Sequence, residues 1–399
     1  MSLIVLKQGR EKSLLRRHPW IFSGAIQHVD NELTLGATVD LLSFNQQFLA
    51  RASYSPNSQI RARVWTFEDE PIDKEFFRKR IRSAIATRSH LLLGEGLRVR
   101  SNAYRLIYAE SDSIPGLIVD RYGDVLVLQS LTAGSEFWKE TFADLLLEET
   151  GLSTIYERSD ADVRELEGLE PKVGILRGSI SNLQFSIREN GLSFLVNLQH
   201  GHKTGFYLDQ RANHLRVREL AKDKDVLDGF CYTGGFTVNA LAGGAKSVLS
   251  IDSSADALAL CNENIVLNNL DTTRQTSLEG DVFQLLRKFR DENRSFDMII
   301  LDPPKFAPTA AQAGRAARGY KDINLLAFKL LQPGGTLVTF SCSGGIDAAL
   351  FQKIIAGAAL DAGVEAQIVE HLSQGADHPI SLHFPEASYL KGLICYKPR

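Results

Sequence analysis

Three aspartates and one cysteine occupy similar places in the C-terminal half of the chain, each at the end of a short apolar run. Asp228, Asp252 and Asp302 end three such runs, and Cys342 ends another, 40 residues after Asp302. Acidic side chains at the ends of parallel strands can hold the polar groups of a nucleotide-like cofactor. A thiol in the same place can act as a nucleophile. The spacing therefore predicts a cofactor site and a reactive cysteine at one edge of a sheet.

The first of these runs leads into a glycine-containing turn that predicts a cofactor loop. It reads Asp228-Gly229-Phe230-Cys231-Tyr232-Thr233-Gly234-Gly235-Phe236 and feeds a predicted helix. Glycine lets the backbone approach a ligand, and a helix N-terminus favours an anionic group. The alternative is a tight strand–helix connection without a ligand. The loop lacks G-x-G-x-x-G, which argues against NAD.

Two further acidic residues fit the same cofactor. Asp252 lies 24 residues after Asp228, about where an acidic residue binds a ribose diol, although it could also be a simple N-cap. Asp281-Val282-Phe283 offers a carboxylate for an adenine amine and an apolar side chain for its ring. Three acidic strand ends in succession favour S-adenosylmethionine. The predicted cofactor contacts at the strand ends are Asp228, Phe230, Tyr232, Thr233, Gly234, Asp252, Asp281, Val282, Asp302 and Pro303.

The next motif, Asp302-Pro303-Pro304-Lys305-Phe306, indicates a methyl acceptor with a planar nitrogen ring. The two prolines stiffen the loop, so that the Asp302 side chain and the Pro303 carbonyl are held ready to accept hydrogen bonds. Asp-Pro-Pro recurs in methyltransferases that act on such rings. The residue after it is usually aromatic in adenine-N6 enzymes, and Lys305 therefore argues against adenine.

The motif Phe340-Ser341-Cys342-Ser343-Gly344 places a thiol beside the same predicted cleft. Carbon 5 of cytosine is a poor nucleophile until a thiolate adds at carbon 6, so a cysteine here predicts covalent catalysis. Asp302 would bind the ring at N3, and Lys305 is a candidate cation for lowering the thiol pKa. The base that removes the carbon-5 proton stays unassigned. The other cysteines, Cys231, Cys261 and Cys395, are interpreted as packing residues.

The elements that must position these residues fall into three stretches. The first 70 residues contain short strands with turns (3–6, 38–43, 48–54 and 60–66), which suggests a small β-barrel. A helix over 75–90 follows, and then strands at 104–108, 117–120, 125–131 and 154–157 around a helix at 137–149. From about residue 191 strands alternate with helices, which predicts a parallel, doubly wound α/β sheet.

Composition narrows the class of protein. The 399 residues carry a net charge of −3, but residues 1–100 hold 16 Lys and Arg against 10 Asp and Glu. This basic end suits a nucleic-acid-binding module, although a solvated face would look similar. The four cysteines show no zinc or disulfide spacing. We expect a cytoplasmic protein with no signal peptide, no membrane span and no metal.

With these motifs in view, the chain resembles the bacterial 23S ribosomal RNA cytosine-5 methyltransferases that carry an N-terminal PUA domain. The resemblance spans nearly the whole chain. Beyond the catalytic motifs it rests on 17–24, Ser113-Ile114-Pro115-Gly116-Leu117, 202–211, Arg318-Gly319-Tyr320-Lys321-Asp322, Ala376-Asp377-His378-Pro379 and Tyr389-Leu390-Lys391-Gly392.

The resemblance implies a PUA-like RNA-binding domain at 1–72, a central α+β domain at 73–188 and a Rossmann-like class I methyltransferase domain at 189–399. It implies methylation of cytosine carbon 5 in large-subunit ribosomal RNA, with Cys342 as the single nucleophile. The segment thought to close over the cofactor adds Phe206, Tyr207, Asp209 and Arg211 to the predicted contacts. The predicted RNA contacts are Arg10, Lys12, Arg16, Arg17, Lys305 and Arg318.

Two other functions stay open. A guanine-N7 or other RNA base methyltransferase on the same scaffold would need no nucleophilic cysteine. A ribosome-assembly factor that binds RNA without catalysis is the second, although the acidic strand ends and Cys342 argue against it. The sequence leaves the target nucleotide and the oligomeric state open, a homodimer included.

Overall fold

The computed structural model describes residues 2–30, 33–92, 101–306 and 312–399, and it divides into two compact units. Unit 1 consists of Met1–Glu189, Val196–Leu208 and Ala376–Ala387. Unit 2 consists of Asn190–Leu195, Asp209–Gly375 and Ser388–Arg399. A short segment near the C-terminus thus belongs to unit 1, although the chain on either side of it belongs to unit 2.

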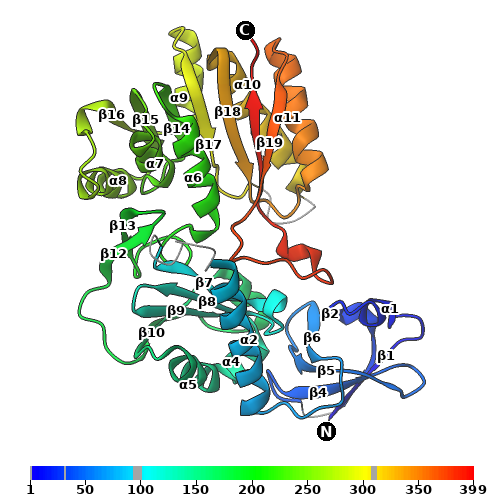
Figure 1. Ribbon diagram of the computed structural model, residues 1–399. Coiled ribbons are helices and arrows are strands. Elements are labelled where there is room, and N and C mark those ends of the chain that lie inside the picture. Colours follow the sequence, from blue (N-terminus) through cyan, green and yellow to red (C-terminus); the bar gives the residue numbers. More distant parts are fainter. Residues whose placement is uncertain (1, 31–32, 93–100, 307–311) are drawn as a thin grey trace. The chain divides into compact units, whose positions relative to one another are not determined.

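The N-terminal part of unit 1 is a six-stranded mixed sheet in the order β2-β6-β5-β4-β1-β3 (Figure 1). Three of the strands have the bounds that the sequence predicts. β2 and β3 are additional, and a short helix, α1 (Lys12–Leu15), precedes β2. The strands are β1 (Leu3–Leu6), β2 (Trp20–Phe22), β3 (Ile26–Val29), β4 (Thr38–Leu42), β5 (Phe48–Tyr54) and β6 (Ile60–Thr66).

A second sheet in unit 1 has its own hydrophobic core and the order β11-β10-β9-β8-β7. Phe77 and Ile81 of α2 pack into that core, as their four-residue spacing predicts. The predicted helix at 137–149 is two helices that meet at Trp138. The elements are α2 (Lys74–Leu92), β7 (Ala103–Tyr108), β8 (Leu117–Tyr122), β9 (Val125–Ser130), α4 (Ala133–Phe137), α5 (Lys139–Thr150), β10 (Thr154–Ser159) and β11 (Lys172–Arg177).

Unit 2 is built on a seven-stranded sheet in the order β16-β15-β14-β17-β18-β20-β19. The first five strands of this order are parallel, and β20 and β19 are antiparallel to their neighbours. The strands are β14 (Asp225–Gly229), β15 (Ser247–Asp252), β16 (Gln275–Glu279), β17 (Phe296–Leu301), β18 (Leu331–Ser341), β19 (Gln367–Leu372) and β20 (Lys391–Tyr396). The predicted doubly wound α/β fold is confirmed. Two further strands, β12 (Gln184–Glu189) and β13 (Leu192–Asn197), form a separate two-stranded sheet.

Helices connect the parallel strands of unit 2 (Figure 1). Three of them, α9, α10 and α11, share one buried core with the sheet, in which Leu286, Tyr320 and Phe351 are almost fully buried. No helix within the described ranges is long and apolar enough to cross a membrane. The helices are α6 (Arg211–Leu220), α7 (Gly235–Ala242), α8 (Ala255–Leu267), α9 (Val282–Asp291), α10 (Ala313–Leu330) and α11 (Ala348–Ala362).

Candidate active site

The register of unit 2 brings the predicted acidic residues to one edge of the sheet. Gly229 of β14 pairs with Ile251 of β15 on one side and with Leu301 of β17 on the other. The residues that follow the two partners are Asp252 and Asp302. Asp228 precedes Gly229, so all three carboxylates lie at the carboxyl ends of adjacent parallel strands, where ligands bind in such sheets.

The turn after β14 has a backbone that needs its glycines. Gly234, the N-cap of α7, has φ 84°, and a β-carbon there would lie 2.4 Å from Sγ of Cys261. A β-carbon on Gly235 would lie 2.6 Å from Nε2 of His214. Phe230 and Tyr232 also have positive φ, which is uncommon for residues other than glycine. This conformation, held by packing on both sides, is of the kind found at ligand sites.

The pKa of the Asp228 carboxyl is strongly shifted at this edge of the sheet. Burial raises the pKa of its carboxyl to about 7, while a hydrogen bond from the Thr237 hydroxyl (2.7 Å) works in the opposite direction. The second oxygen, Oδ1, is buried without a hydrogen-bond partner, as is Oγ1 of Thr233. Buried polar atoms without partners are costly, so these two atoms suit a ligand that supplies hydrogen-bonding groups, such as the amino-acid part of S-adenosylmethionine.

The other predicted cofactor residues along this edge lie in local turns. Asp252 accepts hydrogen bonds from the N–H of Tyr232 (2.9 Å) and of Ser254 (3.0 Å), which ties β15 to the glycine turn. Asp281 is exposed and caps α9 through the N–H of Gln284 (2.9 Å). Val282 is buried in the core. Their contacts with the cofactor stay predictions.

Asp302 is oriented by Gln210, which is not among the predicted site residues. Nε2 of Gln210 donates to Oδ2 of Asp302 (2.8 Å), and Oε1 of Gln210 accepts from Nδ2 of Asn213 (2.6 Å). The second contact determines which way the Gln210 amide faces. Gln210 itself is buried. The sequence signal was its place inside the segment 202–211, but only the fold shows which carboxylate it serves.

The loops after β17 and β18 are joined through Ser343. Its hydroxyl accepts from the N–H of Phe306 (3.1 Å) and shares a hydrogen bond with the Tyr320 hydroxyl (3.0 Å). Pro303 is buried and Asp302 is half-buried. The stiff Asp-Pro-Pro loop and the Cys342 loop therefore lie side by side.

Cys342 differs from the other three cysteines in its accessibility. It is half-buried, whereas Cys231, Cys261 and Cys395 are buried, in agreement with their interpretation as packing residues. Burial raises the pKa of Cys395 to about 12, which leaves that thiol unreactive at neutral pH. Accessibility at the end of a central strand is what a nucleophile requires.

A lysine missing from the predicted site residues lies beside Cys342. Lys391 is the first residue of β20, and it pairs with Ser341, the residue before Cys342. Its Nζ donates to the carbonyl oxygens of Ser343 (2.8 Å) and Tyr389 (2.7 Å). Tyr389 in turn donates its hydroxyl to Asp209. Lys391 occurs in the motif Tyr389-Leu390-Lys391-Gly392, but its position opposite β18 depends on an antiparallel pairing that the sequence does not reveal.

The segment predicted to close over the cofactor is divided between the units. Phe206 and Tyr207 belong to unit 1, where the Tyr122 hydroxyl accepts from the Phe206 N–H (3.1 Å) and Lys203 stacks on the Tyr207 ring (4.4 Å). Asp209 and Arg211 belong to unit 2, and both are buried. Their role in cofactor binding stays a prediction.

The predicted RNA contacts are surface residues. Arg10, Lys12 and Arg16 are exposed around α1, and Lys305 and Arg318 are exposed in unit 2. Trp20 is held by Glu110, which accepts from its indole N–H (2.7 Å), and it packs on Phe384. That arrangement favours a packing role for Trp20.

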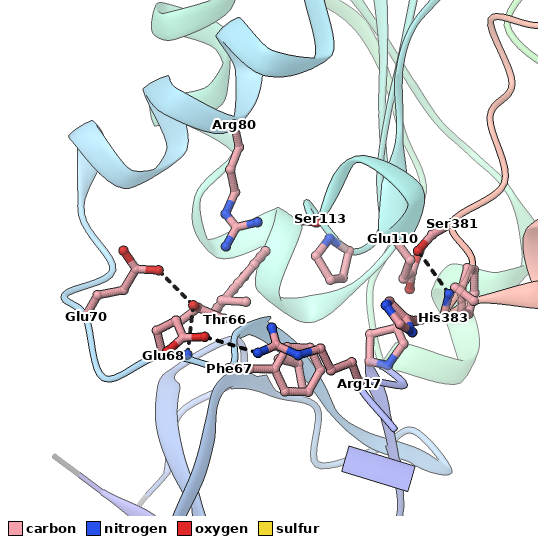
Figure 2. Close-up of a pocket in the computed structure, with 15 residues that line it drawn as sticks. Arg17, Thr66, Phe67, Glu68, Glu70, Arg80, Glu110, Ser113, Ser381 and His383 are labelled. Atoms are coloured by element: carbon pink, nitrogen blue, oxygen red, sulfur yellow. Dashed lines mark hydrogen bonds and ion pairs between the residues drawn. The ribbon is translucent and has the colours of Figure 1, made fainter. Parts of the chain in front are cut away.

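Arg17 lines a pocket of about 360 Å³ in unit 1 (Figure 2). There it pairs with Glu68 (3.3 Å), while the Thr66 hydroxyl donates to Glu70 (2.7 Å). Arg80 points into the pocket from α2, and burial lowers its pKa. Acidic and basic side chains thus both line this pocket. It holds none of the predicted catalytic residues, and the described residues include no cluster of His, Cys, Asp or Glu suited to a metal ion.

Comparison with known proteins agrees with this geometry. Residues 176–391 match the family described as S-adenosylmethionine-dependent methyltransferase, and residues 4–67 match a PUA-like domain. The first match identifies S-adenosylmethionine as the cofactor. Among solved structures, SMU.776 complexed with SAH superimposes with a TM-score of 0.86 at 23% identity, over 99% of this chain and 100% of that one. The fold is therefore that of a class I methyltransferase with an N-terminal PUA-like domain.

Curated relatives cover the whole length. Proteins named "Ribosomal RNA large subunit methyltransferase I" are 50% identical over 394 residues in Vibrio cholerae, 52% over 395 in Tolumonas auensis and 49% over 393 in Escherichia coli. Each alignment covers 98% of this chain and 98% of the relative. This chain belongs to the ribosomal RNA large subunit methyltransferase I family, within the S-adenosylmethionine-dependent methyltransferases.

Proposed function

We propose that this protein methylates carbon 5 of a cytosine in large-subunit ribosomal RNA, through a covalent bond between Cys342 and carbon 6 of the ring. Methylation of ribosomal RNA follows from the family, whose curated members are named for the large subunit. The observation that supports cytosine and the covalent route is the position of Cys342. It is the most accessible of the four cysteines, and it lies at the end of the strand next to the Asp-Pro-Pro loop.

The chemistry begins with the pyrimidine. The Cys342 thiolate adds to carbon 6, and the ring electrons move so that carbon 5 becomes nucleophilic. Negative charge develops at N3 of the ring during this addition, so Asp302, oriented by Gln210, would hold the N3 side as the protonated acid and donate a hydrogen bond to N3. When bound, S-adenosylmethionine supplies an electrophilic methyl group. The carbon-5 proton then leaves to a base, the carbon 5–carbon 6 double bond re-forms, and the carbon–sulfur bond breaks to release the thiolate.

The residues of the first two strand ends would hold the cofactor. Asp228 and Thr233 offer buried polar atoms that have no protein partner, and Asp252 lies where a ribose diol is usually bound. Asp281 would accept from the adenine amine. A target inside a duplex must be flipped out to reach Cys342, with exposed cations such as Arg10 and Lys12 contacting phosphates.

The test is transfer of labelled methyl to ribosomal RNA, with the product identified by nucleoside mass spectrometry. We expect 5-methylcytosine from the wild type and none from Cys342→Ala. The control is cofactor binding by calorimetry, which should be the same in both proteins. Methylation of another base, or 5-methylcytosine that survives the substitution, would contradict the proposal and favour a guanine-N7 or other base methyltransferase. If the wild type bound no cofactor, the result would favour a non-catalytic assembly factor.

A further inference from the structure

The proposed reaction needs a base that takes the carbon-5 proton, and the amine of Lys391 is hydrogen-bonded to the loop around Cys342. β20 runs antiparallel to β18, so the amino end of β20 lies at the carboxyl end of β18. That amino end is Lys391, paired with Ser341. The only residue between Ser341 and Ser343, whose carbonyl accepts from Lys391, is Cys342.

Two hydrogen bonds determine how the amine is oriented. Nζ of Lys391 donates to the carbonyls of Ser343 (2.8 Å) and Tyr389 (2.7 Å). A neutral amine has two N–H bonds, and both are used here, so its lone pair must occupy the remaining tetrahedral position. When the amine is protonated, the third N–H takes that position. The same geometry therefore serves both forms, and little rearrangement is needed when a proton arrives.

The surroundings of Lys391 favour a mixture of the neutral and protonated amine near neutral pH. Burial is the main cause that lowers the pKa of Lys391, to about 8, and the charge of Lys305 adds to this effect. Cys342 and Asp347, the N-cap of α11, act in the opposite direction. A lysine with a pKa lowered by burial can act as a general base, because a useful fraction is neutral at working pH.

We propose that Lys391 is the base that removes the carbon-5 proton of the methylated cytosine adduct, an assignment that rests on the proposed function. The lone pair of the neutral Lys391 amine takes the proton and becomes an ammonium. The electron pair of the carbon–hydrogen bond forms the carbon 5–carbon 6 double bond, and the electron pair of the carbon 6–sulfur bond returns to Cys342 as a thiolate. The ammonium is then deprotonated by water before the next cycle.

A different role for Lys391 would act at a different step. If its ammonium served only to stabilise the thiolate, its loss would prevent the addition of Cys342 to carbon 6. If it served only to hold the loop, its loss would weaken cofactor binding or folding. As the base, it acts after the methyl group has been transferred, so its loss should trap RNA on the enzyme.

The experiment compares Lys391→Met and Lys391→Arg with wild type on large-subunit particles, and on RNA extracted from them, from cells that lack this enzyme. Lys397→Met is the matched control. Lys397 lies just beyond the opposite end of β20, its Nζ also donates to two carbonyls, of Phe328 and Leu331, and burial also lowers its pKa. The readouts are released 5-methylcytosine and a methyl-labelled protein–RNA adduct that survives denaturation.

For Lys391→Met and Lys391→Arg we expect 5-methylcytosine release to fall by about 10²- to 10⁴-fold, the usual contribution of a general base. We expect the methyl-labelled adduct to accumulate to nearly one per active site. The wild-type turnover rate should rise with pH and level off above about 8, as the amine loses its proton. Lys397→Met should release product as the wild type does.

Two results would overturn the proposal. One is release of 5-methylcytosine at the wild-type rate by both Lys391 variants. The other is a folded, cofactor-binding variant that forms neither product nor adduct, which would place Lys391 before methyl transfer. Should Lys391→Met fail to fold, Lys391→Arg keeps a cation in place and tests the same step. Failure of the proposed function is distinguishable, because wild type would then form no 5-methylcytosine, or Cys342→Ala would still form it.

Discussion

Ionisable groups in the interior of unit 1 have different hydrogen-bond partners from those at the strand ends of unit 2. In unit 1, Arg105 donates two hydrogen bonds of 2.8 Å to Asp120, and Lys139 lies 2.9 Å from Glu157. In unit 2, Asp228 is held by a neutral hydroxyl, and Lys391 by two carbonyl groups. The first set is paired with opposite charges, and the second set is bonded to neutral groups.

The difference in hydrogen-bond partners goes with a difference in pKa. Hydrogen bonds from Lys172, Lys139 and Arg164 outweigh the burial of Glu136 and lower its pKa to about 2, so it stays ionised. Burial instead outweighs the nearby opposite charges and moves the pKa of Asp228 to about 7 and that of Lys391 to about 8. Groups that titrate near neutral pH can exchange protons or bind ligands, and such groups cluster at functional sites. Both groups lie at the edge of the unit 2 sheet where the sequence motifs predict the site.

The largest expected effect is at Cys342. Cys342→Ser keeps the size of the side chain but replaces the thiol with a weak nucleophile. We expect methyl transfer to fall by about 10⁴-fold or more, the scale seen when a covalent nucleophile is lost. Initial rates with labelled cofactor measure this. An unchanged melting temperature would show that the substitution spares the fold, and a loss below about 10-fold would contradict the nucleophile assignment.

The next largest effect is expected when one of the paired charges of unit 1 is removed. Glu136→Gln leaves the buried cations Lys139 and Arg164 with one partner fewer, and we expect a loss of roughly 3 kcal/mol in the free energy of unfolding. Because the native pKa of Glu136 is lowered, its stabilisation is present above its usual pKa and is lost as pH falls toward about 2. Denaturant unfolding at several pH values measures both.

Glu140→Gln is the control for this variant, because Glu140 is exposed and pairs with Arg177 at the surface. Its cost should be below about 1 kcal/mol. A Glu136→Gln protein as stable as this control would show that the pairing in unit 1 is not what stabilises the unit.

The third prediction concerns Asp228, whose carboxyl is hydrogen-bonded to a neutral hydroxyl group. Asp228→Asn should weaken S-adenosylmethionine binding by about 10- to 100-fold, because a charge-assisted hydrogen bond is lost. The raised pKa means that the native carboxyl holds its proton more tightly than the unfolded one, so its contribution to stability falls as pH rises through about 7. The cofactor-free variant should therefore gain most over wild type above pH 7.

Calorimetry and thermal unfolding at pH 5 and pH 8 measure the two effects. Asp225→Asn is the matched control, since Asp225 begins the same strand and pairs with Lys246 (2.9 Å) at the other end. It should bind cofactor as wild type does. Equal cofactor affinity in Asp228→Asn and wild type would remove Asp228 from the site.

The smallest effect concerns exposed cations, which belong neither to the charge-paired groups of unit 1 nor to the groups at the strand ends of unit 2. Lys12→Gln should weaken RNA binding by only a few fold and reduce the slope of log K against log salt by about 0.7 to 0.9 for the lost phosphate contact. Fluorescence anisotropy at several salt concentrations measures the slope. Lys288→Gln, an exposed lysine on α9, is the control, and equal slopes for the two variants would exclude Lys12 from the RNA surface.

The sequence by itself determined which aspartates lie together at the strand ends. Asp228, Asp252 and Asp302 could be placed together because parallel strands all present their carboxyl ends at one edge, so that a local pattern implies a spatial neighbourhood. It also predicted the bounds of β1, β5 and β6, which are rich in apolar residues. β2 escaped prediction because it has only three residues, and β3 escaped it because Gln27 and His28 interrupt its apolar residues.

Only the tertiary structure decided which residues serve the site from elsewhere in the chain. Gln210 reaches Asp302 across 92 positions, and Lys391 reaches the carbonyl of Ser343 across 48. The segment Ala376–Ala387 joins unit 1, where the Asp377 carbonyl accepts from Arg88, 289 positions away. Such contacts depend on how an antiparallel strand pairs and where the chain returns. Those choices follow from the summed packing of whole elements, and no local pattern of residues encodes them.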